Sequence, residues 1–149
     1  MKYDVVIIGA GPAGLFAAYQ LTKENSKIKV CLIDQGRVAS KRTCPMKKTE
    51  KCANCEPCAI LSGFGGAGTF SDGKLNFIPK LGKSDLFKYV SREEAWNLID
   101  YTEEIFNKFH MDSKVYPTNM KEADAIKEKI AKCGAELLVI KQKHLGSDH

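Results

Sequence analysis

The stretch YDVVIIGAGPAG at residues 3–14 decides the fold of the first part of this chain. A short apolar run rich in β-branched residues, Val5 to Ile8, leads into a G-x-G-x-x-G turn, and apolar residues then recur at helical spacing. A second apolar run ends in an acid, Asp34, which lies 20 residues after Gly14. This order of strand, glycine-rich turn, helix, strand and acid predicts a Rossmann-like βαβ unit that binds a dinucleotide.

Each part of the predicted unit has a chemical reason. Gly9 permits the tight turn, Gly11 lets backbone N–H groups approach a pyrophosphate, and Gly14 lets the helix pack closely on the strand. The helix N-terminus favours phosphate, and Asp34 is predicted to accept hydrogen bonds from a ribose. The cofactor-binding residues predicted here are Gly9, Gly11, Pro12, Ala13, Gly14, Asp34 and Gln35. The alternative is a βαβ unit whose glycines serve only the turn.

The composition, 44% apolar and 28% charged, favours a soluble globular protein. No apolar run approaches membrane-spanning length, and the N-terminus resembles neither a signal nor a transit peptide, which predicts a cytoplasmic protein without a membrane partner. The net charge is +5, and part of it lies in a basic stretch from Lys41 to Lys51. We interpret this stretch as balancing a cofactor's charge or as a solvated loop. It lacks the interleaved aromatics that nucleic-acid binding would favour.

The rest of the chain divides by residue pattern. Residues 37–62 form a long loop rich in Lys and Cys, and residues 63–76 are rich in glycine, so that backbone could approach a flat ligand closely. A capping box at Ser91 predicts a helix ending near His110, and Asn119 begins a second one ending at Gly134. Residues 79–83 predict a turn, and residues 136–140 a strand.

Four of the six cysteines fall within 15 residues and give the spacing C-x7-C-x2-C-x2-C. Two-residue spacing lets neighbouring thiolates turn onto one ion, so the group is a candidate ligand set for zinc or an iron–sulfur cluster. A redox-active dithiol and plain reduced thiols are the open alternatives. The candidate metal ligands are Cys44, Cys52, Cys55 and Cys58.

The segment GAGPAGL at residues 9–15 resembles the N-terminal FAD-binding segment of two-dinucleotide flavoproteins of the glutathione reductase superfamily, with Asp34 in place of the more usual Glu. Together with the cysteine group and SGFGGAGTFSDGKLN at residues 62–76, it resembles the N-terminal part of bacterial FAD-dependent dehydrogenases. His144 to Asp148 looks like a further segment of that family. The resemblance implies that four residues lie near FAD, namely Gly65, Gly66, Ser71 and Asp72, and that Arg42 contacts the cofactor.

Members of that family are several times longer. The resemblance therefore implies an incomplete α/β domain: an FAD-binding segment at residues 1–83 with a cysteine-containing insertion, then a helical segment with a strand and the start of a second domain at residues 84–149. We expect such a fragment to bind FAD weakly, to catalyse poorly and to self-associate through uncovered apolar strands.

The leading functional hypothesis is the FAD-binding portion of a flavin-dependent oxidoreductase, with NAD(P)H as electron donor to the full-length protein and an unknown small-molecule substrate. Catalytic side chains are not readable from the sequence. The alternatives are an NAD(P)-binding Rossmann protein and a non-enzymatic electron-transfer module built on the cysteines.

Overall fold

The computed structural model describes residues 2–145. The chain divides into two compact units, Met1–Ser71 and Asp72–His149. The boundary between these units follows residue 71. The functional division predicted after residue 83 stays a prediction. None of the helices in residues 2–145 combines the length and the apolar character needed to cross a bilayer.

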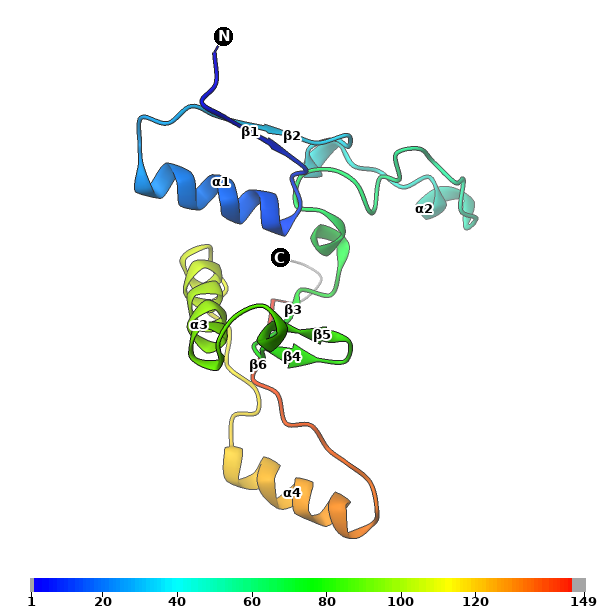
Figure 1. Cartoon of the computed structure of the whole chain (residues 1–149). Coiled ribbons are helices and arrows are strands. Elements are labelled where there is room, and N and C mark those ends of the chain that lie inside the picture. The colour runs from blue at the N-terminus through cyan, green and yellow to red at the C-terminus, as the bar shows by residue number, and fades with distance from the viewer. Residues whose placement is uncertain (1, 146–149) are drawn as a thin grey trace. The chain divides into compact units, whose positions relative to one another are not determined.

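The first unit begins with the predicted βαβ arrangement (Figure 1). Strand β1 (Val5–Ile8) pairs in parallel with β2 (Val30–Ile33), and helix α1 (Pro12–Glu24) connects them. The register places Val5 opposite Val30 and Ile8 opposite Ile33. A parallel pair needs a crossover connection, and the helix supplies it. The mixed helices and small sheets agree with the α/β class expected from the sequence.

Burial alternates along β1, as the two-residue period of a strand requires. Ile7 faces helix α1, because its Cγ2 lies 3.4 Å from where a Cβ on Gly14 would be. Val6 and Ile8 point to the other side of the sheet, where their side chains are 53% and 87% exposed. One face of the small sheet is therefore covered by α1, and the opposite face presents apolar side chains to solvent.

The remainder of the first unit is a long irregular segment with short helical turns. These turns are the 3-10 helix η1 (Ala39–Lys41), the helix α2 (Met46–Thr49) and the 3-10 helix η2 (Ala67–Phe70). The predicted cysteine-containing loop is thus present, and the glycine-rich segment that follows it returns to the βαβ unit.

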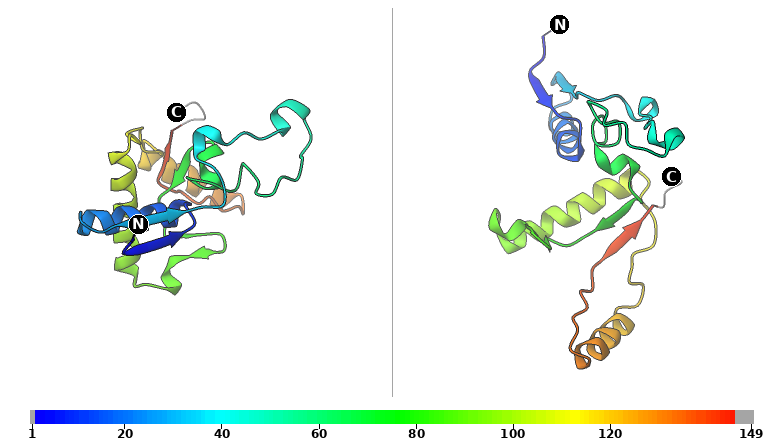
Figure 2. Two further views of the ribbon diagram at one scale, coloured as in Figure 1. Left: turned by 90° about the horizontal axis from the view of Figure 1, so that it is seen from above. Right: turned by 90° about the vertical axis from the view of Figure 1, so that its right-hand side faces the viewer.

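The second unit is built around a short antiparallel pair, β3 (Lys74–Asn76) and β6 (Gln142–His144) (Figure 2). On its other side β6 is bridged to Tyr116, whose N–H and C=O both bond to Gln142 at 2.8 Å. The predicted turn near residue 82 is a tight hairpin between β4 (Lys80–Leu81) and β5 (Ser84–Asp85), with Gly82 at φ +58°. A 3-10 helix, η3 (Leu86–Lys88), follows.

Both helices predicted for the second unit are present with their caps. Helix α3 (Arg92–Lys108) begins at Ser91, whose Oγ accepts the Glu94 N–H at 3.2 Å. Helix α4 (Met120–Lys132) begins at Asn119, whose Oδ1 accepts the Glu122 N–H at 3.3 Å. A side-chain acceptor at this position satisfies one of the free N–H groups of the first turn, which explains why the sequence located both starts.

The prediction of a strand at residues 136–140 was wrong. This run is irregular, and the strand lies further along at Gln142–His144. Leu137 to Ile140 instead line a hollow together with Ala123 and Ile126 of α4. The apolar character of the run thus serves packing against a helix, which strand-like composition alone does not distinguish from pairing in a sheet.

Candidate dinucleotide-binding site

The glycine-rich turn after β1 has the conformation that its sequence predicts. Gly9 has φ +101°, a region that side-chain-bearing residues rarely adopt, and its N–H donates to the Ile33 carbonyl at 2.7 Å. A Cβ on Gly14 would lie 1.9 Å from the Gly9 carbonyl oxygen. Gly9 therefore makes the turn, and Gly14 allows the start of α1 to press against it.

The outer side of this turn is open. A Cβ added to Gly9 or Gly11 would meet no atom within 4 Å. Helix α1 begins with Gly11 as its N-cap and Pro12 in its first turn, and no side chain caps its free N–H groups. A helix start of this kind, with its partial positive charge and room for approach, suits a phosphate group.

Asp34 lies at the end of β2 and is held against the turn by backbone donors. Its Oδ2 accepts the Ala10 N–H at 2.8 Å and its Oδ1 accepts the Gly36 N–H at 2.8 Å. The Ala10 hydrogen bond, and then that of Gly36, hold the pKa of this carboxyl below its ordinary value, with a smaller contribution from Arg42. A carboxylate has about four acceptor positions, so further hydrogen bonds to a ligand hydroxyl are allowed.

The second glycine-rich segment meets the first. The Gly65 N–H donates to the Ala10 carbonyl at 2.8 Å, and Ala10 is fully buried between them. A Cβ on Gly66 would lie 3.3 Å from both Gly11 Cα and Pro12 Cδ. Residues 65 and 66, which the family resemblance assigned to the cofactor region, thus lie beside the open turn.

Arg42 is buried, with 6% of its surface exposed, and its guanidinium group is surrounded by carbonyl oxygens. Nε donates to Ala59 O at 2.8 Å, and Nη2 donates to Ile60 O at 2.6 Å. Nη1 donates to the carbonyls of Phe64 and Gly66 at 3.0 and 2.9 Å. Arg42 therefore holds residues 59–66 in place against the turn, a structural role that the sequence did not reveal.

The sequence also did not predict a close backbone crossing beside Arg42. A Cβ on Gly36 would lie 2.4 Å from the Ser62 carbonyl carbon, and one on Gly63 would lie 2.3 Å from Arg37 O. Gly63 also has φ +119°. Glycine at both positions lets the start of the loop and its end pass each other, which brings the glycine-rich segment back to β2.

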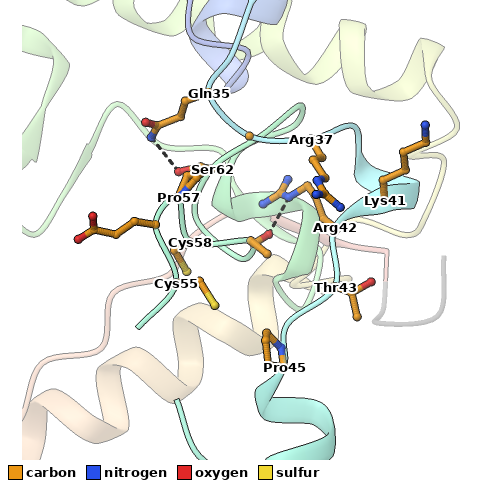
Figure 3. A pocket seen from close by; sticks show the side chains of 13 residues that line it. Gln35, Arg37, Lys41, Arg42, Thr43, Pro45, Cys55, Pro57, Cys58 and Ser62 are labelled. Carbon is orange, nitrogen blue, oxygen red and sulfur yellow. Dashed lines mark hydrogen bonds between the residues drawn. The ribbon is translucent and has the colours of Figure 1, made fainter. Parts of the chain in front are cut away.

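A hollow of about 400 Å³ opens beside Asp34 in the first unit (Figure 3). Gln35 lies at one edge, where its Nε2 donates to Ser62 Oγ at 3.0 Å. The other lining side chains include Arg37, Lys41 and Thr43. The hollow therefore has a polar wall with more positive than negative side chains, Glu56 being the one carboxylate among its lining residues.

Cys55 and Cys58 line the same hollow. Hydrogen bonds from the Leu61 and Ile60 N–H groups, followed by the charge of Arg42, lower the pKa of the Cys58 thiol. Cys52 points its Sγ toward Asn54 Oδ1 at 3.5 Å.

The predicted metal site receives no support from the structure. All six cysteines are free thiols, and residues 2–145 contain no group of three or more His, Cys, Asp or Glu side chains arranged to hold a metal ion. The irregular loop brings Cys55 and Cys58 to one hollow but does not gather Cys44 and Cys52 with them into such a group. Zinc and iron–sulfur binding were predicted from the sequence spacing of the cysteines alone, and this spacing does not specify how the loop folds.

The remaining predicted site residues are placed as follows. Ser71 closes η2, where its Oγ donates to the Gly68 carbonyl at 2.9 Å. Asp72 belongs to the second unit and pairs with Lys74 at 3.5 Å. His144 ends β6, and the family-like residues 146–148 that follow it lie outside the described residues.

Comparisons with known proteins identify a family for this chain. The chain is 53% identical over 53 residues to an uncharacterised protein of Methanosarcina barkeri (strain Fusaro / DSM 804). That match covers 36% of this chain and 13% of the relative, so the chain spans a small part of the relative's length. No solved structure matches the chain. The family described as pyridine nucleotide-disulphide oxidoreductase matches residues 3–140, and the chain therefore belongs to that family.

Proposed function

We propose that this chain binds FAD at the Gly9–Gly14 turn and is the cofactor-binding portion of a flavin-dependent oxidoreductase. The observation that carries the proposal is the meeting of two glycine-rich segments beside an uncapped helix start, with an acid at the end of the next strand. Family membership supports redox cofactor binding in general. The choice of FAD over NAD(P) rests on the resemblance of residues 9–15 and 62–76 to flavoprotein segments.

The residues present fit such a cofactor. The free N–H groups at the start of α1 would face the pyrophosphate, and Gly11 leaves the space that this approach needs. Asp34 would accept a ribose hydroxyl while keeping its two backbone donors. Gly65 and Gly66 would border the same region, and Arg42 would act by holding these glycines in place.

Bound FAD would supply the hydride or electron transfer of the reaction, and the chain would supply binding, orientation and charge balance. The hollow next to Asp34 offers the adenosine end a polar wall with Gln35, Arg37 and Lys41. We further propose NAD(P)H as the electron donor of the whole protein.

Titration separates FAD from NAD(P) as the ligand. The chain is titrated with FAD, followed by flavin fluorescence, and separately with NADH and NADPH, followed by nicotinamide fluorescence. We expect tighter binding of FAD. Tighter binding of a nicotinamide nucleotide would support the alternative of an NAD(P)-binding Rossmann protein, and no binding of any of them would contradict the site.

Asp34→Ala tests the site itself. Loss of a charge-assisted hydrogen bond to ribose is expected to weaken FAD binding about tenfold to hundredfold. Asp4→Ala is the matched control, because Asp4 also accepts a backbone N–H, from Lys29 at 2.8 Å, but at the opposite end of the β1–β2 pair. Equal affinity losses in the two variants would show that the effect is not specific to the proposed ribose contact.

A further inference from the structure

The small sheet of the second unit has one covered and one open face. Cross-strand partners project to the same face of a sheet, so Leu75 and its partner Lys143 lie on one side of the β3–β6 pair. Lys143 is buried there, where its Nζ donates to Asn107 Oδ1 at 2.6 Å and lies 3.3 Å from Glu103 Oε1 of α3. Helix α3 therefore covers this side.

The opposite face of the sheet is polar. In the β3–β6 pair (Figures 1 and 2), Lys74 is paired with His144 and Asn76 with Gln142. The bridge between Gln142 and Tyr116 adds one more strand-like segment beside β6. A hollow of about 430 Å³ lies on this face, lined by Lys74, Ser113, Lys114, Tyr116, Gln142 and His144. The lining thus combines two ammonium groups with hydroxyl, amide and imidazole donors, and it contains no carboxylate.

The charge at this hollow is unevenly compensated. Asp72 pairs with Lys74 at 3.5 Å, and the hydrogen bond from the Lys74 backbone N–H, followed by the charges of Lys74 and His144, lowers the pKa of that carboxyl. Lys114 has no ion-pair partner within residues 2–145. The hollow therefore keeps a cation that is available to an anionic ligand.

Ser113 adds an independent observation. Its Oγ is buried and has no hydrogen-bond partner in the part of the chain that the structure describes. A buried hydroxyl without a partner destabilises a protein, and such groups are rare unless a ligand, an ion or water satisfies them. Ser113 is among the residues that line the hollow, so a ligand that shifts the cover of this hydroxyl on binding would provide the missing acceptor.

We propose that this hollow binds a small oxyanion, a carboxylate or a phosphate, through Lys114 and the Ser113 hydroxyl, with Lys74 and His144 along its β3–β6 wall. The site lies wholly in the second unit and shares no residue with the Gly9–Gly14 turn. Its volume admits a small organic anion, so a substrate carboxylate and a phosphate group are the two sources of the same chemistry.

The test is a titration of the 149-residue chain with inorganic phosphate, with succinate and with chloride at matched ionic strength, followed by backbone amide NMR shifts. We expect saturable shifts at Lys114, Gln142 and His144 with phosphate or succinate and none with chloride. Tighter binding of succinate would indicate a carboxylate ligand, and tighter binding of phosphate would indicate a phosphate group. Equal shifts with chloride, or shifts confined to other residues, would overturn the proposal.

Three variants sharpen the test. Lys114→Gln is expected to weaken binding about threefold to tenfold, the effect of one exposed charge contact. Lys129→Gln removes the same charge from exposed α4 outside the hollow and is expected to leave binding unchanged. Ser113→Ala is expected to weaken anion binding without lowering the stability of the anion-free protein, because it removes a hydroxyl that has no partner. Equal loss in both lysine variants, or unchanged binding in Ser113→Ala, would contradict the site.

Discussion

The glycines of residues 9–14 and those of residues 63–66 meet at one place, but they are glycines for different reasons. Nothing lies within 4 Å of a Cβ built on Gly9 or Gly11. A Cβ on Gly63 or Gly65, in contrast, would lie 2.3 Å from Arg37 O or 2.1 Å from Thr69 Oγ1. The first segment faces open space at two of its three glycines, whereas the second is packed against its own unit.

This difference separates binding from folding. An open glycine at a helix start leaves room for a ligand, so its replacement is expected to affect the ligand more than the fold. A crowded glycine with positive φ allows two backbones to cross, so its replacement is expected to affect the fold first. Glycine-rich segments of similar composition therefore have two physical roles here, ligand access and close backbone packing. Substitution of single glycines distinguishes these roles.

The largest effect is expected for Gly63→Ala. The added Cβ would meet Arg37 O at 2.3 Å and Arg42 Cδ at 2.9 Å, in a backbone with φ +119°. We expect a loss of about 3–5 kcal/mol in the free energy of unfolding, in the range of severe overpacking with backbone strain. Urea unfolding followed by circular dichroism measures it. Gly82→Ala is the control, since Gly82 also has positive φ but no neighbour within 4 Å of its Cβ. Equal stability losses in both variants would show that the positive φ, and not the crowding of the added Cβ, causes the loss.

A smaller and different effect is expected for Gly11→Ala. Gly11 has φ −73°, which alanine adopts freely, and its Cβ would enter open space. We expect a stability loss of only about 0.5–1 kcal/mol, because alanine is a poorer N-cap than glycine, but FAD affinity at least about tenfold lower because the methyl group blocks the approach of the pyrophosphate. Urea unfolding and FAD titration on the same preparation check both parts. A stability loss as large as that of Gly63→Ala would remove the contrast between the two segments.

The smallest effect concerns pH. Backbone hydrogen bonds hold the pKa of Asp34 below the ordinary value of 3.8, so its carboxylate stabilises the folded state above that value. This contribution is lost as pH falls through the lower, folded-state pKa. We expect the urea midpoint of the wild type to exceed that of Asp34→Asn at pH 6, with the two midpoints converging below pH 3. A constant difference across that range would mean that the charge of Asp34 does not stabilise the turn.

The sequence by itself determined the features that depend on neighbouring residues. The β1–α1–β2 unit and the starts of α3 and α4 follow from local spacing, glycine conformation and side-chain caps, and each lies where the sequence predicted it. The coarse α/β class and the conformational roles of Gly9 and Gly14 were predictable for the same reason. Binding of FAD by these residues stays a prediction, because no ligand contact follows from the turn alone.

Only the tertiary structure decided how distant residues meet. The cofactor contact of Arg42 stays a prediction, whereas its protein partners are carbonyls 17 to 24 residues further along the chain, which no local pattern indicates. Gly36 and Gly63 are required by a backbone crossing, and β6 lies at Gln142–His144 because Asn76 and Tyr116 are there to pair with it. The spacing of the cysteines predicted a shared ion, while the loop brought two of them to one hollow. Local patterns specify local hydrogen bonds, whereas long-range partners are selected by how the whole unit packs.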